Sequence, residues 1–209
     1  MSEKAQNWTY SELFVAESDA IASARERAGQ LGCPSVSPGT GAALRQLAAI
    51  SGARSVVEIG TGTGVSSMWL LEGMDAEGVL TTIDSEREFH KAAKAEFANA
   101  GIKSTRTRTI TGHALEVLPR LADGAYDLIF VGTEAIDYPS FITQALRLLR
   151  TGGLLILDNA LWYGKVADPA NREEVPSLLR EIGRSLLEDS AWIVSLQPTG
   201  NGLLLATKR

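Results

Sequence analysis

The chain has 209 residues, enough for one α/β domain with a substantial core and too few for two full domains. Its content of 44% hydrophobic and 22% charged residues is ordinary for a globular protein. The net charge of −5 argues against a surface that follows phosphates, so we expect no nucleic-acid partner. The single cysteine, Cys33, excludes an intramolecular disulfide, and its place in a loop before Pro34 favours a structural residue over a reactive thiol.

The N-terminal sequence has neither the apolar core of a signal peptide nor the Arg-rich pattern of a transit peptide. No apolar run approaches the roughly 20 residues of a membrane span. We therefore expect a cytoplasmic protein without a membrane partner. Because no repeat, low-complexity segment or linker interrupts the chain, residues 1–209 are predicted to be a single domain, with a helical extension at 1–34 and the core at 35–209.

The predicted helices begin with the Ala-, Glu- and Arg-rich stretch from Tyr10 to about Gly29, which indicates one or two helices outside the sheet. Ser37-Pro38 predicts the start of the next helix, because proline favours the first helical position. Three further segments have helical patterns: Val65–Met74, the amphipathic stretch from Phe89 to Gly101, and Phe141–Leu149, which Thr151-Gly152-Gly153 is expected to end.

The predicted strands are apolar or β-branched runs at Val56–Ile59, Val79–Ile83, Thr105–Ile110, Tyr126–Val131 and Leu154–Leu157. Helices between strands imply parallel crossovers, so the fold class is α/β, with a doubly wound, Rossmann-like, mostly parallel sheet. Two last strands, Trp192–Gln197 and Leu203–Thr207, are joined by a segment too short for a crossover and are predicted to form an antiparallel hairpin.

The third of these strands alternates arginine and threonine, which is typical of a strand near a sheet edge. Its Arg106 and Arg108 either form a basic patch or cover a solvated strand face. The second alternative is the simpler one.

A glycine-rich turn follows the first strand, with glycines at alternate positions: Gly60, Gly62 and Gly64. A strand, a glycine turn and a helix N-terminus together allow the backbone to approach a ligand closely. The dinucleotide-binding spacing G-x-G-x-x-G would require a third glycine where the chain has Val65 or Ser67. An acidic residue before Gly-x-Gly-x-Gly instead resembles the first motif of class I S-adenosylmethionine (SAM)-dependent methyltransferases.

In open parallel sheets, ligands bind at the carboxyl ends of the strands. Asp84 ends the second strand and is placed to accept both hydroxyls of a ribose, or to cap the next helix, a role that Ser85 could also fill. Ser66 can offer its hydroxyl and backbone N–H to the carboxylate of a bound amino-acid moiety. Glu58 either orients that moiety, braces the loop, or is a buried acid satisfied by backbone N–H groups.

Several short motifs occur together in one order: Val36–Gly39, Val57–Gly62, Leu80–Asp84, Leu118–Leu121, Tyr126–Phe130, Leu148–Gly153, Asp158–Val166 and Pro198–Leu203. In this order the chain resembles the catechol and caffeoyl-CoA O-methyltransferase family from Ser35 to the C-terminus. The resemblance implies a seven-stranded sheet with its last strand antiparallel, SAM as methyl donor, a small-molecule acceptor and a homodimer.

The resemblance also implies the positions that contact the cofactor: Val36, Glu58, Gly60, Thr61, Ser66, Asp84, Ser85, Gly112 and His113. His113 would then lie beside the adenine. Considered without the resemblance, it is a histidine in a surface turn.

The chain departs from the family pattern after the fourth strand, where the family has Asp-Ala-Asp-Lys and this chain has Gly132-Thr133-Glu134-Ala135. In the family, the first Asp is a metal ligand and the Lys lies near the reacting hydroxyl. The other two family metal ligands are retained as Asp158 and Asn159. Because Mg²⁺ requires near-octahedral oxygen coordination, one carboxylate and one amide make a weak site unless Glu134 contributes.

Methyl transfer from a sulfonium mainly requires positioning of the nucleophile and removal of its proton. With metal chelation weakened or lost, deprotonation is assigned to Glu134 or Asp137, or the acceptor needs no strong base. Tyr138, Trp162 and Tyr163 are predicted to form an aromatic wall of the acceptor site, or else to serve packing.

The predicted function is transfer of a methyl group from SAM to a hydroxyl oxygen of a small phenolic acceptor. A SAM-binding protein that has lost catalysis is the main alternative, and the changes at Gly132 and Ala135 favour it. An N-methyltransferase acting on nucleic acid would have an Asn/Asp-Pro-Pro-aromatic run after the fourth strand, which this chain lacks. A nucleotide-dependent dehydrogenase is disfavoured by the glycine spacing.

Overall fold

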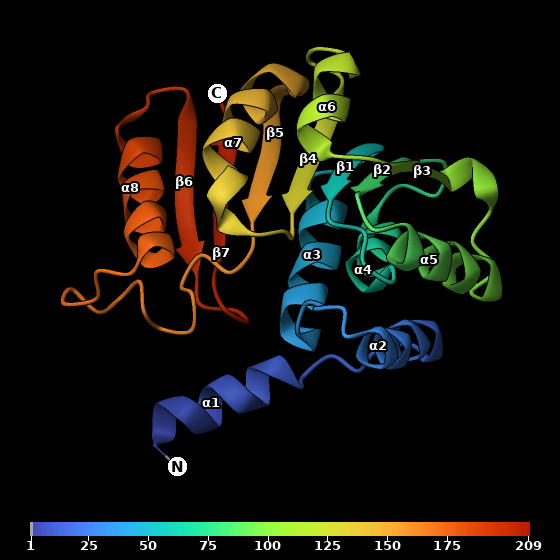
Figure 1. Cartoon of the computed structure of the whole chain (residues 1–209), viewed down its shortest axis with the longest axis horizontal. Helices are drawn as coiled ribbons and strands as arrows, with labels where there is room; N and C mark the ends of the chain where they lie inside the picture. Colours follow the sequence, from blue (N-terminus) through green and yellow to red (C-terminus); the bar gives the residue numbers. More distant parts are fainter. Residues whose placement is uncertain (1) are drawn as a thin grey trace.

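The computed structural model describes residues 2–209. Seven strands form one sheet in the order β3-β2-β1-β4-β5-β7-β6 (Figure 1). They are β1 (Ser55–Ile59), β2 (Val79–Asp84), β3 (Thr107–Thr111), β4 (Tyr126–Val131), β5 (Leu149–Leu157), β6 (Trp192–Gln197) and β7 (Leu203–Lys208). The first five are parallel, and β7 runs antiparallel to both β5 and β6. The predicted fold class, including its C-terminal hairpin, is therefore confirmed.

The helices are α1 (Glu3–Glu12), α2 (Asp19–Leu31), α3 (Pro38–Ile50), α4 (Val65–Gly73), α5 (Arg87–Asn99), α6 (Ala114–Val117), α7 (Tyr138–Leu148) and α8 (Glu174–Glu188). Short 3₁₀ turns lie at Ser104–Arg106, Leu118–Arg120 and Ala135–Asp137. The predicted helix start at Ser37 is confirmed, because the Thr40 N–H donates to Ser37 Oγ at 3.1 Å. Figure 1 shows α1 and α2 outside the sheet, beyond the ends of β4 and β5 to which the arrows point.

The sheet is buried on both faces, because alternate residues of its central strand join different cores. Val57 and Ile59 of β1 belong to one apolar cluster, together with side chains of α7 and α8. Val56 belongs to the other, together with side chains of α2, α3, α4 and α5. This arrangement agrees with an apolar run that lacks polar alternation. Because both faces of the sheet are buried, the polar loops gather at the carboxyl ends of the parallel strands.

Three elements differ from the sequence predictions. Thr105 and Arg106 belong to a 3₁₀ turn, so β3 begins at Thr107, although it is an edge strand as predicted. Residues 149–153 belong to β5 rather than to the end of α7, with a register shift against β4. Helix α8 was not predicted.

Arg106 fits neither of its two predicted roles. Its guanidinium donates to the carbonyl oxygens of Asp75 at 2.8 Å and of Leu71 and Gly78 at 3.3 Å. Leu71 lies in the last turn of α4 and the other two residues follow its end, where a cation is favoured by the helix dipole. Arg108, by contrast, is exposed. Arg106 is therefore a cap for the C-terminal end of α4.

Candidate active site

The glycine turn has a backbone that other residues adopt only with strain. Gly60, Gly62 and Gly64 have φ values of 95°, 51° and 94°. A Cβ on Gly60 would lie 2.8 Å from Thr133 Cγ2, so the turn also packs closely against the loop after β4. Gly64 precedes α4 and supplies no side-chain cap to that helix. The first N–H groups of α4 are therefore suited to an anionic ligand group.

Glu58 lies fully buried beneath this turn, and its carboxylate accepts three hydroxyl hydrogen bonds. Ser66 Oγ and Thr82 Oγ1 donate at 2.6 Å each, and Ser67 Oγ is the third donor. Burial raises the pKa of Glu58 to about 7, although the three hydroxyls act in the opposite direction. The acid thus links β1, β2 and α4. This arrangement corresponds to a brace for the loop, with hydroxyls in place of the backbone N–H partners considered above.

This network also constrains two neighbouring positions predicted to contact the cofactor. The Ser66 hydroxyl donates to Glu58, so the donor that Ser66 keeps for a ligand is its backbone N–H. Thr61 is buried, and its Oγ1 lies 2.6 Å from Thr82 Oγ1. Thr61 can therefore face a ligand with its backbone rather than with its side chain.

Asp84, at the end of β2, holds the glycine turn from the neighbouring strand. Its Oδ2 accepts from the Gly62 N–H and its Oδ1 from the Glu86 N–H, both at 2.8 Å. Each carboxylate oxygen can accept a second hydrogen bond, so the pair can still receive two ribose hydroxyls. Ser85 is exposed beside it. The two roles predicted for Asp84, ligand contact and support of the following turn, are thus compatible.

The end of β3 carries the residues predicted near the adenine. Gly112 is half-buried and His113 is exposed before α6. A second histidine, His90 of α5, is buried, and its Nδ1 lies 2.5 Å from Thr111 Oγ1. Burial lowers the pKa of His90. The sequence did not identify His90 as a residue near the site. The only signal there was a polar residue on the apolar stripe of α5.

The loop before α3 covers the glycine turn from another side. Val36 is buried there. Cys33 is also buried, and a Cβ on Gly62 would lie 3.0 Å from its Sγ. Burial raises the pKa of the Cys33 thiol, which agrees with a structural rather than a reactive residue.

The ends of β4 and β5 carry the residues predicted near the acceptor. Glu134 and Asp137 are exposed on either side of the short turn after β4. Asp158 is only 7% exposed, and burial raises the pKa of its carboxyl to about 6. Asn159 follows it with φ 54°, in the left-handed region.

Of the three predicted wall aromatics, Tyr138 does not line the site. It is fully buried in the first turn of α7, and its hydroxyl donates to the carbonyls of Asp158 at 2.9 Å and Thr133 at 3.1 Å. Of the two roles considered for Tyr138, the structure supports packing rather than the aromatic wall, because the side chain belongs to the core. Trp162 is half-buried, Tyr163 is exposed, and their ring centroids are 5.8 Å apart.

The side chains on this rim do not fit a Mg²⁺ site. Gly132 offers no side-chain oxygen, and Glu134 is exposed on the turn after β4, which leaves the Asp158 carboxylate and the Asn159 amide as the oxygen ligands. Within residues 2–209, no three or more His, Cys, Asp or Glu side chains come together as a possible metal site. Mg²⁺ usually takes one or two carboxylates and completes its octahedron with waters or substrate oxygens, so a single carboxylate with one amide makes a weak site. We therefore assign no chemical step to a metal.

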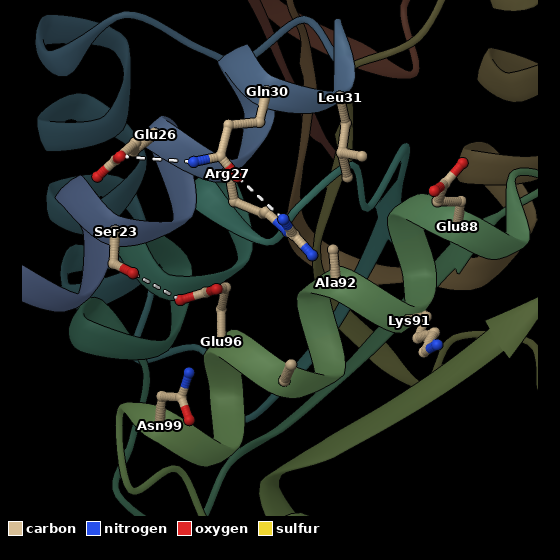
Figure 2. Close-up of a pocket in the computed structure, with 11 residues that line it drawn as sticks. Ser23, Glu26, Arg27, Gln30, Leu31, Glu88, Lys91, Ala92, Glu96 and Asn99 are labelled. Atoms are coloured by element: carbon tan, nitrogen blue, oxygen red, sulfur yellow. Dashed lines mark hydrogen bonds between the residues drawn. The ribbon is translucent and has the colours of Figure 1, made fainter.

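A groove of about 460 Å³ runs between α2 and α5 (Figure 2). It contains none of the predicted site residues. Its wall carries side chains of both charge signs, among them Arg27, Lys91 and Glu96, and Ser23 Oγ donates to Glu96 Oε2 at 2.9 Å. Because acidic and basic side chains are mixed along its wall, the groove points to no ligand class.

The sheet order, the glycine turn and Asp84 on the neighbouring strand define a SAM-binding fold of the class I methyltransferase type. A model of the O-methyltransferase family matches residues 14–209. A Mycobacterium tuberculosis protein named as a probable O-methyltransferase is 44% identical over 201 residues, which are 96% of this chain and 90% of that relative.

Solved structures are similar over almost the whole chain. A Corynebacterium glutamicum protein superposes with a TM-score of 0.91 at 31% identity, covering 99% of this chain and 97% of that one. The O-methyltransferase TomG from Streptomyces achromogenes, involved in tomaymycin synthesis and solved in complex with SAM, has a TM-score of 0.84 at 31% identity, covering 100% and 99%.

The chain therefore belongs to the O-methyltransferase family, and its class is that of the SAM-dependent O-methyltransferases. The family predicted from the ordered motifs is confirmed. The chain therefore belongs neither to a dehydrogenase family nor to a family of N-methyltransferases that act on nucleic acid. In the part of the chain that the structure describes, no helix is long and apolar enough to cross a bilayer.

Proposed function

We propose that this protein transfers the methyl group of SAM to a hydroxyl oxygen of a small phenolic acceptor, without a bound metal ion. The observation that carries the proposal is the glycine turn, which Glu58 and Asp84 hold to β2 and α4 and whose Gly60 packs closely against the loop after β4. This turn keeps the glycines and the two acids predicted for a cofactor site, whereas the residues beside it lack the family's first metal ligand.

The cofactor is expected to lie across the carboxyl ends of β1, β2 and β3. Its amino-acid carboxylate would meet the uncapped N–H groups at the start of α4, near Gly60 and Ser66. Its ribose would meet Asp84, and its adenine the turn at Gly112 and His113. SAM supplies a methyl group bound to a sulfonium, which is a good leaving group. The protein's part is to bind and orient.

In the transfer, a bond forms between the acceptor oxygen and the methyl carbon while the opposite S–C bond breaks. The reactants must therefore be held in line, which the ends of β1 and β4 can do. The hydroxyl proton passes to Glu134 or Asp137, both exposed to the rim. A phenol is acidic enough for such a carboxylate to assist as the new bond forms.

A catalytically weakened SAM-binding protein is the second candidate. Gly132 and Ala135 favour it, because they remove a metal ligand and a lysine that the family places near the reacting hydroxyl. This candidate predicts tight SAM binding without turnover.

One experiment separates the two. Isothermal titration with SAM is combined with transfer of a radiolabelled methyl group to catechol and to caffeoyl-CoA, each with Mg²⁺ and with EDTA. We expect SAM binding and methylation that persists in EDTA. Binding without methylation of either acceptor would support the second candidate, and activity lost on chelation would contradict the metal-free proposal.

Asp84 provides the matched variant for the cofactor site. Asp84→Asn turns one acceptor oxygen into an N–H donor, which would oppose Gly62 N–H or Glu86 N–H. The loss is expected to weaken SAM binding about tenfold or more. Glu88→Ala, an exposed change on α5, is the control and should bind SAM as the wild type does.

We further propose a homodimer in solution. Trp8, Tyr10, Leu13 and Phe14 place large apolar side chains on the exposed surface of α1 and its C-terminal end. Clustered exposed apolar side chains of this kind mark contact surfaces.

A further inference from the structure

Glu12, the last residue of α1, is a buried carboxylate without a cationic partner. It is 6% exposed, and its Oε1 accepts a hydrogen bond of 2.7 Å from the N–H of Gly200, which lies 188 residues along the chain. Its Oε2 is buried without a hydrogen-bond partner. A carboxylate in this position is costly to bury, so its place calls for an explanation.

The carboxylate is tolerated because it lies at the start of α3. A Cβ on Gly39, the second residue of that helix, would lie 2.6 Å from Glu12 Oε1 and 2.7 Å from Oε2. The N-terminal end of a helix carries partial positive charge, which favours a nearby carboxylate. The electrostatic cost of burying Glu12 is thereby reduced without a basic side chain.

Two glycines make room for this contact. Gly39 leaves the space that the Glu12 carboxyl fills. Gly200 has φ 57°, and a Cβ there would overlap Thr40 Oγ1. These glycines come from two motifs at opposite ends of the chain, Val36–Gly39 and Pro198–Leu203, and the contact with Glu12 brings the motifs together.

The loop that Glu12 holds in turn supports the acceptor rim. In this loop, which joins β6 to β7, the Gly202 carbonyl accepts from the Ala160 N–H at 2.9 Å and the Asn201 carbonyl from the Leu161 N–H at 2.7 Å. Ala160 and Leu161 directly follow Asn159, whose φ is 54°. A continuous series of contacts therefore joins α1 to the segment that begins at Asp158.

We propose that Glu12 is a positioning residue for the acceptor: its contact with Gly200 fixes the 198–202 loop and, through that loop, the 158–162 segment. The inference rests on the proposed function, because it assigns this rim to the acceptor. It predicts that loss of the contact impairs use of the acceptor far more than SAM binding, since the glycine turn and Asp84 are not part of the series and Val36 is the one predicted cofactor contact beside it.

Glu12→Ala, Glu12→Gln and the wild type are compared by amide hydrogen exchange and by methylation of catechol at saturating SAM. In Glu12→Ala, exchange should rise at residues 198–202 and 158–162, and the KM for catechol should rise about tenfold, as expected for loss of a hydrogen bond to a charged group. The dissociation constant for SAM should stay within about twofold of the wild type, which is well below the tenfold effect of 1.4 kcal/mol.

Glu12→Gln is the conservative variant, because its amide oxygen can still accept from Gly200. It should restore most of the wild-type protection against amide exchange and most of the wild-type KM for catechol. If the negative charge of Glu12 alone were required, Glu12→Gln would restore neither. Glu181→Ala, which removes an exposed carboxylate from α8, is the control and should match the wild type throughout.

Gly39→Ala gives an independent test, since the new methyl group would push the Glu12 carboxyl aside without removing it. Alone, this variant should reproduce Glu12→Ala, whereas in the Glu12→Ala background it should have no further effect. Unchanged exchange in both loops, or equal effects on SAM and catechol, would overturn the inference. A wild type that methylates no acceptor would refute the proposed function, and the exchange data would then still decide whether Glu12 holds the two loops.

Discussion

At the residue scale, two opposing effects set the protonation of Glu58. Full burial disfavours its ionised form, and three hydroxyl donors favour it, with the outcome that the pKa rises from 4.5 to about 7. The folded protein therefore binds a proton at Glu58 more tightly than the unfolded chain does. Near neutral pH the acid lies close to its midpoint, directly below the glycine turn.

This shift predicts a specific pH dependence of stability. The contribution of Glu58 to the free energy of unfolding is fully present below pH 4.5 and is lost as the pH rises to about 7. The loss amounts to roughly 3 kcal/mol, from 1.36 kcal/mol per pKa unit. Because hydroxyls can donate or accept, Glu58→Gln should fold and should lack this dependence.

Urea unfolding of both proteins without SAM, at intervals from pH 4.5 to 8, measures the difference. The stability of Glu58→Gln relative to the wild type should increase across this range and then level off. Glu181→Gln, an exposed change, should follow the wild type. Parallel curves for the wild type and Glu58→Gln would mean that the pKa of Glu58 is close to its unfolded value.

Individual site residues differ in how far the sequence could reveal them. Glu58 and Asp84 were predicted because each stands at a fixed place in a strand-and-turn motif, where local sequence determines position. Glu12 and His90 were missed because their partners, Gly200 and Thr111, come from other elements and are brought near only by the folded chain. No local pattern records such a contact.

At the element scale, Arg106 shows how a strand residue can complete a distant helix. Its guanidinium donates to the carbonyls of Leu71 in the last turn of α4 and of Asp75 and Gly78 beyond it. Only the planar, multi-donor head of arginine serves all of them together.

Arg106→Ala is therefore expected to lower the free energy of unfolding by about 1–3 kcal/mol, the range for the loss of hydrogen bonds made by a charged group. Arg106→Lys should recover only part of the loss. Arg108→Ala, two residues along and exposed, should change stability by less than about 0.5 kcal/mol. Denaturant unfolding of the three variants checks the prediction, and equal losses for Arg106→Ala and Arg108→Ala would contradict the capping role.

The elements themselves were largely predictable, and the differences have physical causes. Buried strands could be recognised from their apolar runs. Gly152 and Gly153 were interpreted as a helix stop, but sheet pairing extends β5 over them, with a register shift where glycines commonly occur. Helix α8 could have been found from its apolar residues at helical spacing: Val175, Leu178, Leu179, Ile182 and Leu186.

At the scale of the whole molecule, the strand order places the cofactor turn and the acceptor rim side by side. Strands β1 and β4 are neighbours although 66 residues lie between Ile59, where β1 ends, and Tyr126, where β4 begins. The parallel crossovers could be predicted, and with them the gathering of strand ends on one edge. The position of α1 could not, because it depends on contacts such as that of Glu12 rather than on its own sequence.

The exposed surface of α1 leads to a prediction about assembly. Tyr10 and Phe14 are each 70% exposed, and their ring centroids lie 5.8 Å apart, so they form one apolar surface that water contacts. Burying that surface against a second copy would remove the cost of hydrating it. We expect light scattering after size exclusion to give twice the mass of one chain.

The double change Tyr10→Ser and Phe14→Ser should shift this species towards the monomer, while circular dichroism stays that of the wild type. Ile50→Ser and Leu187→Ser remove equally exposed apolar side chains from other elements and serve as the matched control. A monomeric wild type would contradict the homodimer. A dimer that withstands the α1 changes would place the contact between the two copies on another surface, because the apolar area lost from α1 is too large to be neutral in a contact that includes it.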